Sequence, residues 1–177
     1  MNFDFKQDHF SLFGLPRRFA LDAGQLDSAW RTVAAQVHPD RYASAGDAEK
    51  RAALMMATHA NEAYRTLKSP LARARYLLQL AGVDTQEDTN TSMPADFLMA
   101  QMEWREAIGE AKDEHDVAAL EKLARELQRD AAALQQQLGV ALDDAGDLDG
   151  AAVLVRKLRF LEKLEQEIGD AIESLLF

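Results

Sequence analysis

The sequence predicts an all-α protein with an N-terminal antiparallel helix pair, joined by a charged loop, and a C-terminal three-helix bundle. Ala, Leu, Glu, Gln and Arg abound in the 177 residues, which include only 9 Gly and 4 Pro, and this composition favours helix. Apolar residues recur at spacings of three and four, as on one helix face. A polar, threonine-rich stretch at residues 83–93 lacks this periodicity and is expected to be a linker.

The first helix of the pair is expected between Asp22 and Val37, after an apolar segment at residues 10–13 that ends at Gly14. Asp22 and Gln25 are typical of a helix start, because side chains three residues apart can cap each other's backbone N–H groups. The apolar face of this helix has residues at spacings of four, three and four: Leu26, Trp30, Val33 and Val37.

The loop that follows contains the tripeptide His38-Pro39-Asp40. Pro39 lacks an amide hydrogen and disfavours helical geometry in the preceding residue, so the helix has to end here. Asp47 is expected to cap a second long helix that reaches about Lys68, with an apolar stripe at Ala52, Met56, Ala60, Ala63 and Leu67. Two such helices pack antiparallel, which makes the charged loop between them a candidate contact surface.

A closing helix is expected after the pair. Ser69 and Pro70 combine a capping hydroxyl with proline in the first turn, which is typical of a helix start. Gly82 is a favoured residue for the left-handed position at a helix C-terminus, and the linker follows it.

Three amphipathic helices with short connections are expected after the linker. The first runs from about Pro94 to Ala111. The second ends near Gly139 and carries a leucine stripe at Leu120, Leu123, Leu127, Leu134 and Leu138. A loop at residues 142–150 precedes the third helix, whose stripe includes Leu154, Leu158, Leu161, Ile168, Ile172 and Leu175.

Charge is unevenly distributed along the chain. The net charge of −10 divides into +3 for residues 1–78 and −13 for residues 79–177. The acidic half would repel phosphates, so nucleic-acid binding is not expected there, and no stretch has the apolar length of a membrane span. The chain has no cysteine, which fits a reducing compartment; we expect the cytoplasm and no secretory signal.

Motifs for catalysis or metal binding are absent from the sequence. There is no Gly-rich phosphate loop and no His-Glu-x-x-His pair, and the four histidines are scattered. The acidic loop at residues 142–150 fails as a calcium loop, because no glutamate stands at its twelfth position. We therefore expect no enzymatic activity, no cofactor and no metal.

The residues after the His-Pro-Asp loop give it a context. The run ANEAYRTLKSPLARARY at residues 60–76 resembles the closing helix of a J-domain, the module by which DnaJ-type co-chaperones dock onto and activate seventy-kilodalton heat-shock chaperones. Further segments are similar to HscB proteins, the J-domain co-chaperones of iron–sulfur cluster assembly: FSLFGLP at 10–16, FLMAQMEWRE at 97–106 and VRKLRFL at 155–161. The resemblance implies a J-domain at 8–82, a linker at 83–93 and a scaffold-binding bundle at 94–177.

The resemblance implies that His38, Pro39 and Asp40 bind a dedicated chaperone of the HscA type and trigger its ATP hydrolysis. A carboxylate held out on a proline-stiffened loop suits an arginine of the partner, because charge-assisted hydrogen bonds are strong. The alternative is that these residues only end one helix and order the loop.

The helix before this loop is usually basic in the family, and its charge steers the chaperone. We expect Arg31 and Arg41 to contribute to chaperone binding, with Arg41 in place of the more usual lysine. Charge is missing from three positions where it is expected, namely Ala34, Ala35 and Gln36. Docking is therefore either electrostatically weak or specialised for one chaperone.

The resemblance also implies a surface for the scaffold protein IscU, on which clusters are built. Its residues are Leu98, Met99, Met102, Glu103, Glu106, Glu110 and Phe160. An apolar strip beside a row of glutamates suits a partner patch with a hydrophobic centre and a basic rim. Met99 and Phe160 could equally belong to the bundle core, and Trp104 is expected in that core.

Two alternative functions stay open. A general J-domain co-chaperone would use the bundle to bind unfolded clients through an exposed apolar groove. An acidic helical adaptor would bind a partner without activating any chaperone. The sequence leaves the oligomeric state undecided.

Overall fold

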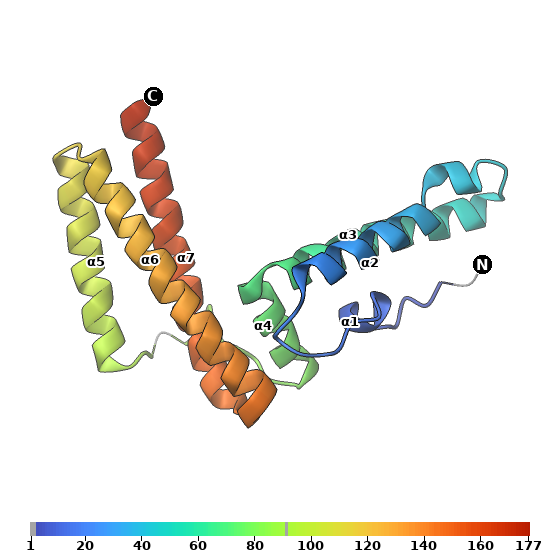
Figure 1. The fold of residues 1–177 in the computed structure, drawn as a ribbon, viewed down its shortest axis with the longest axis horizontal. Helices are drawn as coiled ribbons and strands as arrows, with labels where there is room; N and C mark the ends of the chain where they lie inside the picture. Colours follow the sequence, from blue (N-terminus) through green and yellow to red (C-terminus); the bar gives the residue numbers. More distant parts are fainter. Residues whose placement is uncertain (1–2, 91) are drawn as a thin grey trace. The chain divides into compact units, whose positions relative to one another are not determined.

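The computed structural model describes residues 3–90 and 92–177, and within them it is all-helical, without a strand, as the sequence predicts. These residues form seven α-helices, with a 3₁₀ turn (η1, Pro39–Tyr42) and a π-helical turn (η2, Val140–Ala145) between them; Figure 1 labels the α-helices. The helices are α1 (His9–Leu12), α2 (Ala23–Gln36), α3 (Asp47–Lys68), α4 (Pro70–Leu80), α5 (Ala95–Asp113), α6 (Val117–Gly139) and α7 (Leu148–Leu176).

The chain forms two compact units, Met1–Leu77 and Leu78–Phe177. The division falls inside α4, whereas the sequence-based bounds of 8–82, 83–93 and 94–177 follow composition and resemblance. Those bounds stay predictions. No helix in the described part of the chain combines the length and apolarity that crossing a membrane requires.

The antiparallel pair of α2 and α3 forms the centre of the first unit (Figure 1). Helix α2 begins as predicted, because the Asp22 side chain caps it by accepting a hydrogen bond from the backbone N–H of Gln25 at 3.1 Å. The α3 stripe faces the core through Ala53, Met56, Ala60, Ala63 and Leu67. Ala52, expected on this stripe, is half-buried, since Ala53 rather than Ala52 continues the inward spacing.

The predicted cap of α3 is wrong by one residue. Asp47 is the first residue of the helix, and Gly46 occupies the N-cap position without a side-chain hydrogen bond. Asp47 and Glu49 therefore lie in the first helical turn, where negative charge favourably meets the positive end of the helix dipole.

Polar contacts join α2 to α3 on the side away from the core. The Asp27 carboxylate accepts hydrogen bonds from the Tyr64 hydroxyl at 2.6 Å and the Lys68 ammonium at 2.9 Å. The Trp30 ring stacks on Tyr64 with centroids 4.7 Å apart, and its indole N–H donates to Asn61 Oδ1 at 3.0 Å. Three successive turns of α3 are thus fixed to α2 by specific bonds as well as by packing.

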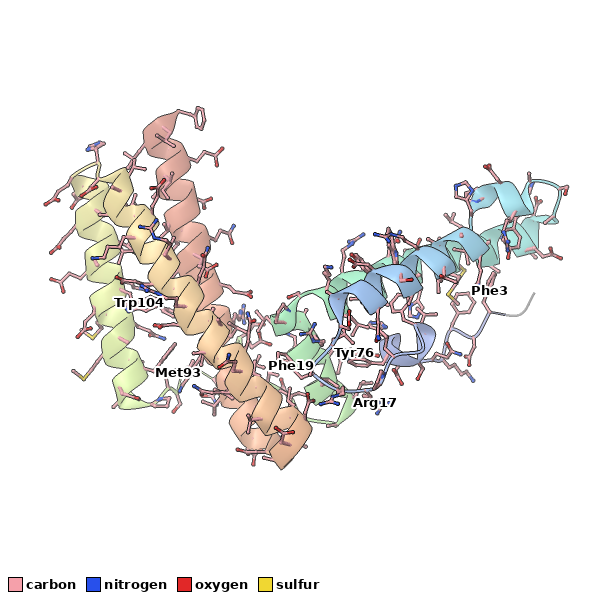
Figure 2. The ribbon with its side chains drawn as sticks, viewed as in Figure 1. Phe3, Arg17, Phe19, Tyr76, Met93 and Trp104 are labelled. Atoms are coloured by element: carbon pink, nitrogen blue, oxygen red, sulfur yellow. The ribbon has the colours of Figure 1, made fainter. Side chains whose placement is uncertain are left out.

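Helix α1 and the first part of α4 complete this unit. Phe10 is buried, and the backbone N–H of His9 donates to the Tyr76 hydroxyl at 2.9 Å. The His9 and Tyr76 rings stack 4.2 Å apart. Figure 2 shows Tyr76 and Phe19 within this first unit. Helix α4 starts as predicted, with Ser69 Oγ accepting from the Ala72 amide at 3.2 Å.

Helices α5, α6 and α7 form the second unit, in which α6 and α7 pack over the greatest length. The helix bounds agree with the prediction to within about three residues. The largest fully buried side chains of this unit are aliphatic: Leu78, Leu120, Leu127, Leu138, Val155, Leu158, Leu164 and Ile168.

The connection between α6 and α7 differs from the predicted loop. Residues 140–145 continue the helix as a wider π-helical turn, and the left-handed Gly146 (φ +61°) then ends it. Asp147 caps α7 by accepting from the backbone N–H of Gly150 at 2.9 Å. The loop prediction was wrong because buried Ala141 anchors this turn, which the acidic sequence does not reveal.

The segment expected to be a linker contacts α7 within the second unit. Thr85 is buried, and its carbonyl oxygen accepts a hydrogen bond from Arg156 Nη1 at 3.0 Å. Arg159 Nη2 lies 2.7 Å from Asp88 Oδ1. These contacts hold the first half of the expected linker; Thr91, also within it, lies outside the described residues.

Candidate functional sites

The His-Pro-Asp tripeptide forms a tight, hydrogen-bonded turn at the end of the helix pair. His38 is the N-cap of η1, and its Nδ1 accepts a hydrogen bond from the Asp40 backbone N–H at 3.2 Å. The Arg41 amide donates to the His38 carbonyl oxygen at 3.0 Å. Pro39 fits the first turn because its fixed φ suits a helical start and it has no N–H to satisfy.

The side chains of this turn are open to solvent. The His38 side chain is 59% exposed and that of Asp40 93%, with His38 Nδ1 lying 3.6 Å from Asp40 Oδ2. Arg41 is also exposed. The sequence-predicted tripeptide is therefore reachable from outside the molecule. An exposed carboxylate on a fixed turn can accept a bidentate hydrogen bond from a guanidinium group.

Tyr42 anchors this turn, a role that the sequence reasoning missed. Its side chain is 8% exposed, and its hydroxyl donates to the Gln36 carbonyl oxygen at 3.4 Å. The Phe3 ring lies against it with centroids 6.3 Å apart. An aromatic residue two positions after Asp40 was the available signal, because a large apolar side chain next to an exposed turn tends to fasten it.

The side of α2 that leads into the turn carries little charge. Arg31 is exposed, whereas the exposed positions that follow it, Thr32, Ala35 and Gln36, are uncharged, and Ala34 is half-buried. Arg31 also helps to hold the pKa of the Asp27 carboxyl below its ordinary value, after the larger effects of hydrogen bonds from Tyr64 and Lys68. On α2 itself the positive charge expected for steering is thus limited to Arg31, and Arg41 adds a second cation in the turn.

A second exposed surface lies on α5, and we call it the α5 strip: Leu98, Met99, Met102, Glu103, Glu106 and Glu110. The apolar members are 42%, 64% and 73% exposed in chain order, and the three glutamates are exposed. Met99 therefore belongs to the surface and not to the core. Large apolar side chains left in water beside a row of carboxylates mark a candidate protein-binding surface.

Phe160, also predicted for this surface, is half-buried in the seam between α7 and α5. Its ring meets the Phe97 ring edge-on at 5.9 Å, and the Arg105 guanidinium lies 5.3 Å from its centroid. Arg105 in turn reaches Glu167 at 3.4 Å. The sequence reasoning missed Arg105, because a lone cation among glutamates resembles an ordinary solvated helix face.

A small, partly open hollow adjoins Phe160 between the helices of the second unit. It has a volume of about 230 Å³, and its lining includes Phe97, Trp104, Lys157 and Phe160. Trp104, expected in the core, is half-buried and lies on the side of α5 that faces α6 (Figure 2). The indole is only partly covered because it lines this hollow, which is partly open to solvent. Among residues 3–90 and 92–177, no three His, Asp or Glu side chains gather in an arrangement that could hold a metal ion.

An antiparallel helix pair that presents a His-Pro-Asp turn, followed by a three-helix unit, defines the class of J-domain co-chaperones. Residues 93–169 match the family described as the HSCB C-terminal oligomerisation domain. A co-chaperone protein HscB homolog of Chromobacterium violaceum is 71% identical over 176 residues, covering 99% of each chain. The homolog from Azoarcus sp. is 51% identical and also covers 99% of each chain.

Solved structures agree with these relatives. HscB from Vibrio cholerae superposes with a TM-score of 0.82 at 35% identity, covering 96% of this chain and 99% of the other. Human HscB gives a TM-score of 0.86 at 30% identity, covering 94% and 82%. The chain therefore belongs to the HscB co-chaperone family. Its relatives are named co-chaperones.

Proposed function

We propose that this protein stimulates the ATPase of a dedicated HscA-type chaperone and delivers the scaffold protein IscU to it, in the cytoplasm. It would thereby assist the maturation of iron–sulfur proteins without being an enzyme itself. The observation that carries the proposal is the exposed Asp40 carboxylate, which stands on a turn fixed by the His38 imidazole and the buried Tyr42.

The chemistry of the turn supports a switch for a partner ATPase. The Asp40 carboxylate is open to accept paired hydrogen bonds from an arginine of the chaperone. The bond from its own amide to His38 Nδ1 already orders the backbone, so little conformational freedom is lost on docking. Arg31 and Arg41 are exposed nearby and add attraction to an acidic chaperone surface.

The α5 strip supports the assignment of a scaffold site. Leu98 and Met102 offer apolar area at the centre of a contact, and the three glutamates offer charge for a basic rim. Phe160, half-buried beside Arg105, would contribute at the edge of this contact. Carrying both surfaces on one chain raises the effective concentration of the scaffold at the chaperone.

An ATPase assay tests the proposal. Chaperone turnover is measured with increasing protein, with and without IscU, for the intact chain and for Asp40→Asn. Asp170→Asn is the control, because this exposed carboxylate lies on α7 in the other unit. We expect stimulation by the intact chain and by Asp170→Asn and its loss in Asp40→Asn. Stimulation that persists in Asp40→Asn rejects the role of the turn.

Capture from a cytosolic extract separates the remaining alternatives. One recovered scaffold protein supports delivery of IscU, whereas many unrelated clients support a general J-domain co-chaperone. Binding without any chaperone stimulation supports an adaptor. The variant Leu98→Ala/Met102→Ala should lose the scaffold protein in the same experiment.

A further inference from the structure

An apolar groove lies beside the His-Pro-Asp turn, within the first unit. Its volume is about 380 Å³, and it is lined by Val37, Pro39, Tyr42, Ala43, Lys50, Ala53, Leu54 and Ala57. Three of these residues are alanines, whose short side chains leave the space open. The groove therefore results from residues of small volume placed between larger ones.

Leu54 forms an exposed part of this groove. Its side chain is 65% exposed, although leucine is among the residues that proteins most often bury. Pro39 lines the same groove, so the apolar surface is continuous with the turn that carries Asp40. A partner that reaches Asp40 would meet Leu54 in the same encounter.

The weak charge of α2 indicates what this groove contributes. Ala34, Ala35 and Gln36 are uncharged, although the resemblance led us to expect basic residues there that would supply long-range attraction. An apolar contact can supply binding energy in their place, because burying side chains such as leucine stabilises a complex largely independently of salt. Lys50 at the groove adds a cation for an acidic neighbour of the bound group.

We propose that this groove receives an aliphatic side chain of the chaperone, next to the arginine that Asp40 binds. The inference rests on the proposed function and adds a second, apolar contact to the docking surface. Leu54 and Pro39 would close over the aliphatic group, while Asp40 fixes its position through the adjacent guanidinium. Docking then depends on shape and apolar area more than on net charge.

The experiment compares two neighbouring exposed residues of α3. Leu54 lines the groove; Met55 does not line it and is 61% exposed. The concentration of protein that gives half-maximal ATPase stimulation is measured for the intact chain, Leu54→Gln and Met55→Gln, at about 50 mM and about 300 mM salt. Thermal unfolding of each variant verifies its fold, which an exposed substitution should preserve.

We expect Leu54→Gln to raise the half-maximal concentration about five- to tenfold at both salt concentrations, with the maximal stimulation unchanged. Met55→Gln should stay within about twofold of the intact chain. An unchanged value for Leu54→Gln, or equal losses in both variants, overturns the groove contact.

The outcomes also separate this inference from the proposed function. If Asp40→Asn abolishes stimulation while Leu54→Gln has no effect, only the groove contact fails. If the intact chain does not stimulate the chaperone, the proposed function fails and the groove contact with it.

Discussion

The Tyr64 hydroxyl donates a 2.6 Å hydrogen bond to Asp27 Oδ1 and thereby joins α3 to α2. This bond is the largest cause of the lowered pKa of the Asp27 carboxyl, followed by the hydrogen bond from Lys68. A carboxyl whose pKa is lowered by folding stabilises the folded state at pH values above its pKa in the unfolded chain. This stabilisation is lost as the pH falls through the pKa of the carboxyl in the folded state.

We expect Tyr64→Phe to raise the pKa of Asp27 towards its ordinary value, because the phenol donor is removed. Carboxyl titration by NMR measures this change directly. Phenylalanine keeps a ring for the stack with Trp30, so packing should be retained. The free energy of unfolding of Tyr64→Phe should also fall less than that of the intact chain when the pH is lowered through the titration of Asp27. An Asp27 midpoint that does not move would contradict the assigned role of this bond.

The variant His38→Asn distinguishes two roles of the His38 side chain, namely capping the turn and contacting the chaperone. Asn is a good N-cap, so its side chain can still accept from the Asp40 amide and keep the turn ordered. We expect His38→Asn to leave the hydrogen-exchange rate of the Asp40 amide unchanged yet lower chaperone stimulation at least about tenfold, since the imidazole surface is lost. Full stimulation would mean that His38 acts only as a cap.

The stability of the first unit should fall as pH drops below neutrality. Burial lowers the pKa of the His9 imidazole, and the neighbouring His59 lowers it further, whereas Glu62 and Asp8 act in the opposite direction. A lowered histidine pKa means that the unfolded chain binds the proton more tightly. The contribution of neutral His9 to the free energy of unfolding is therefore complete above a pH of about 6.5, the pKa of histidine in the unfolded chain. It is lost as the pH falls from there towards the lower pKa in the folded state.

The variant His9→Phe tests this origin, because it keeps a ring for stacking on Tyr76 without a titrating group. Urea unfolding at about pH 7.5 and about pH 5.5 should show a smaller difference in His9→Phe than in the intact chain. His115→Asn is the matched control: His115 is exposed, and its φ of +55° suits Asn. An equal pH effect in all three proteins would rule out His9 as the source.

Variants of the α5 strip and of Phe160 should both weaken scaffold binding, but only the Phe160 variant should clearly lower the free energy of unfolding. Leu98→Ala/Met102→Ala removes exposed side chains, so the free energy of unfolding should change by no more than about 0.5 kcal/mol per site. Phe160→Ala removes a ring packed on Phe97 and should cost about 1–3 kcal/mol. Urea unfolding measures both, and calorimetry with IscU measures binding. A strongly destabilised double variant would contradict the exposed position of the strip.

Two glycines of α7 should respond to alanine with opposite signs. A Cβ at Gly150 would collide with the Asp147 carboxylate, which has to turn away and lose its capping bond at a cost of about 1 kcal/mol. At Gly169 a Cβ meets nothing within 4 Å, so Gly169→Ala should stabilise by about 0.5–1 kcal/mol. Thermal unfolding measures the difference; a gain in both variants would mean that the cap contributes nothing.

The sequence predicted the fold well where local chemistry controls the backbone. The Asp22 and Ser69 caps formed as expected, since a short polar side chain near free helical N–H groups has one dominant use. The turn at residues 140–145 was missed because its helical geometry depends on buried Ala141, and burial is a tertiary property.

Exposure at the candidate sites was harder to predict. Helix α5 carries apolar residues on two sides, with Ile108 buried and Leu98 and Met102 exposed. Periodicity shows that residues share a face, but not which face a neighbouring helix will cover. The roles of Tyr42 and Arg105 likewise depend on ring contacts with residues distant in sequence.

The alanines of α3 limit which substitutions this helix can accept without losing the groove. Ala60 and Ala63 are fully buried in the core of the first unit, whereas Ala53 and Ala57 leave the hollow beside Pro39. Filling that hollow, for instance by Ala57→Leu, is an obvious way to gain thermal robustness, since added apolar contacts raise the melting temperature. The same methyl groups would occupy the space reserved for the partner. Heat resistance and recognition therefore compete for one small volume.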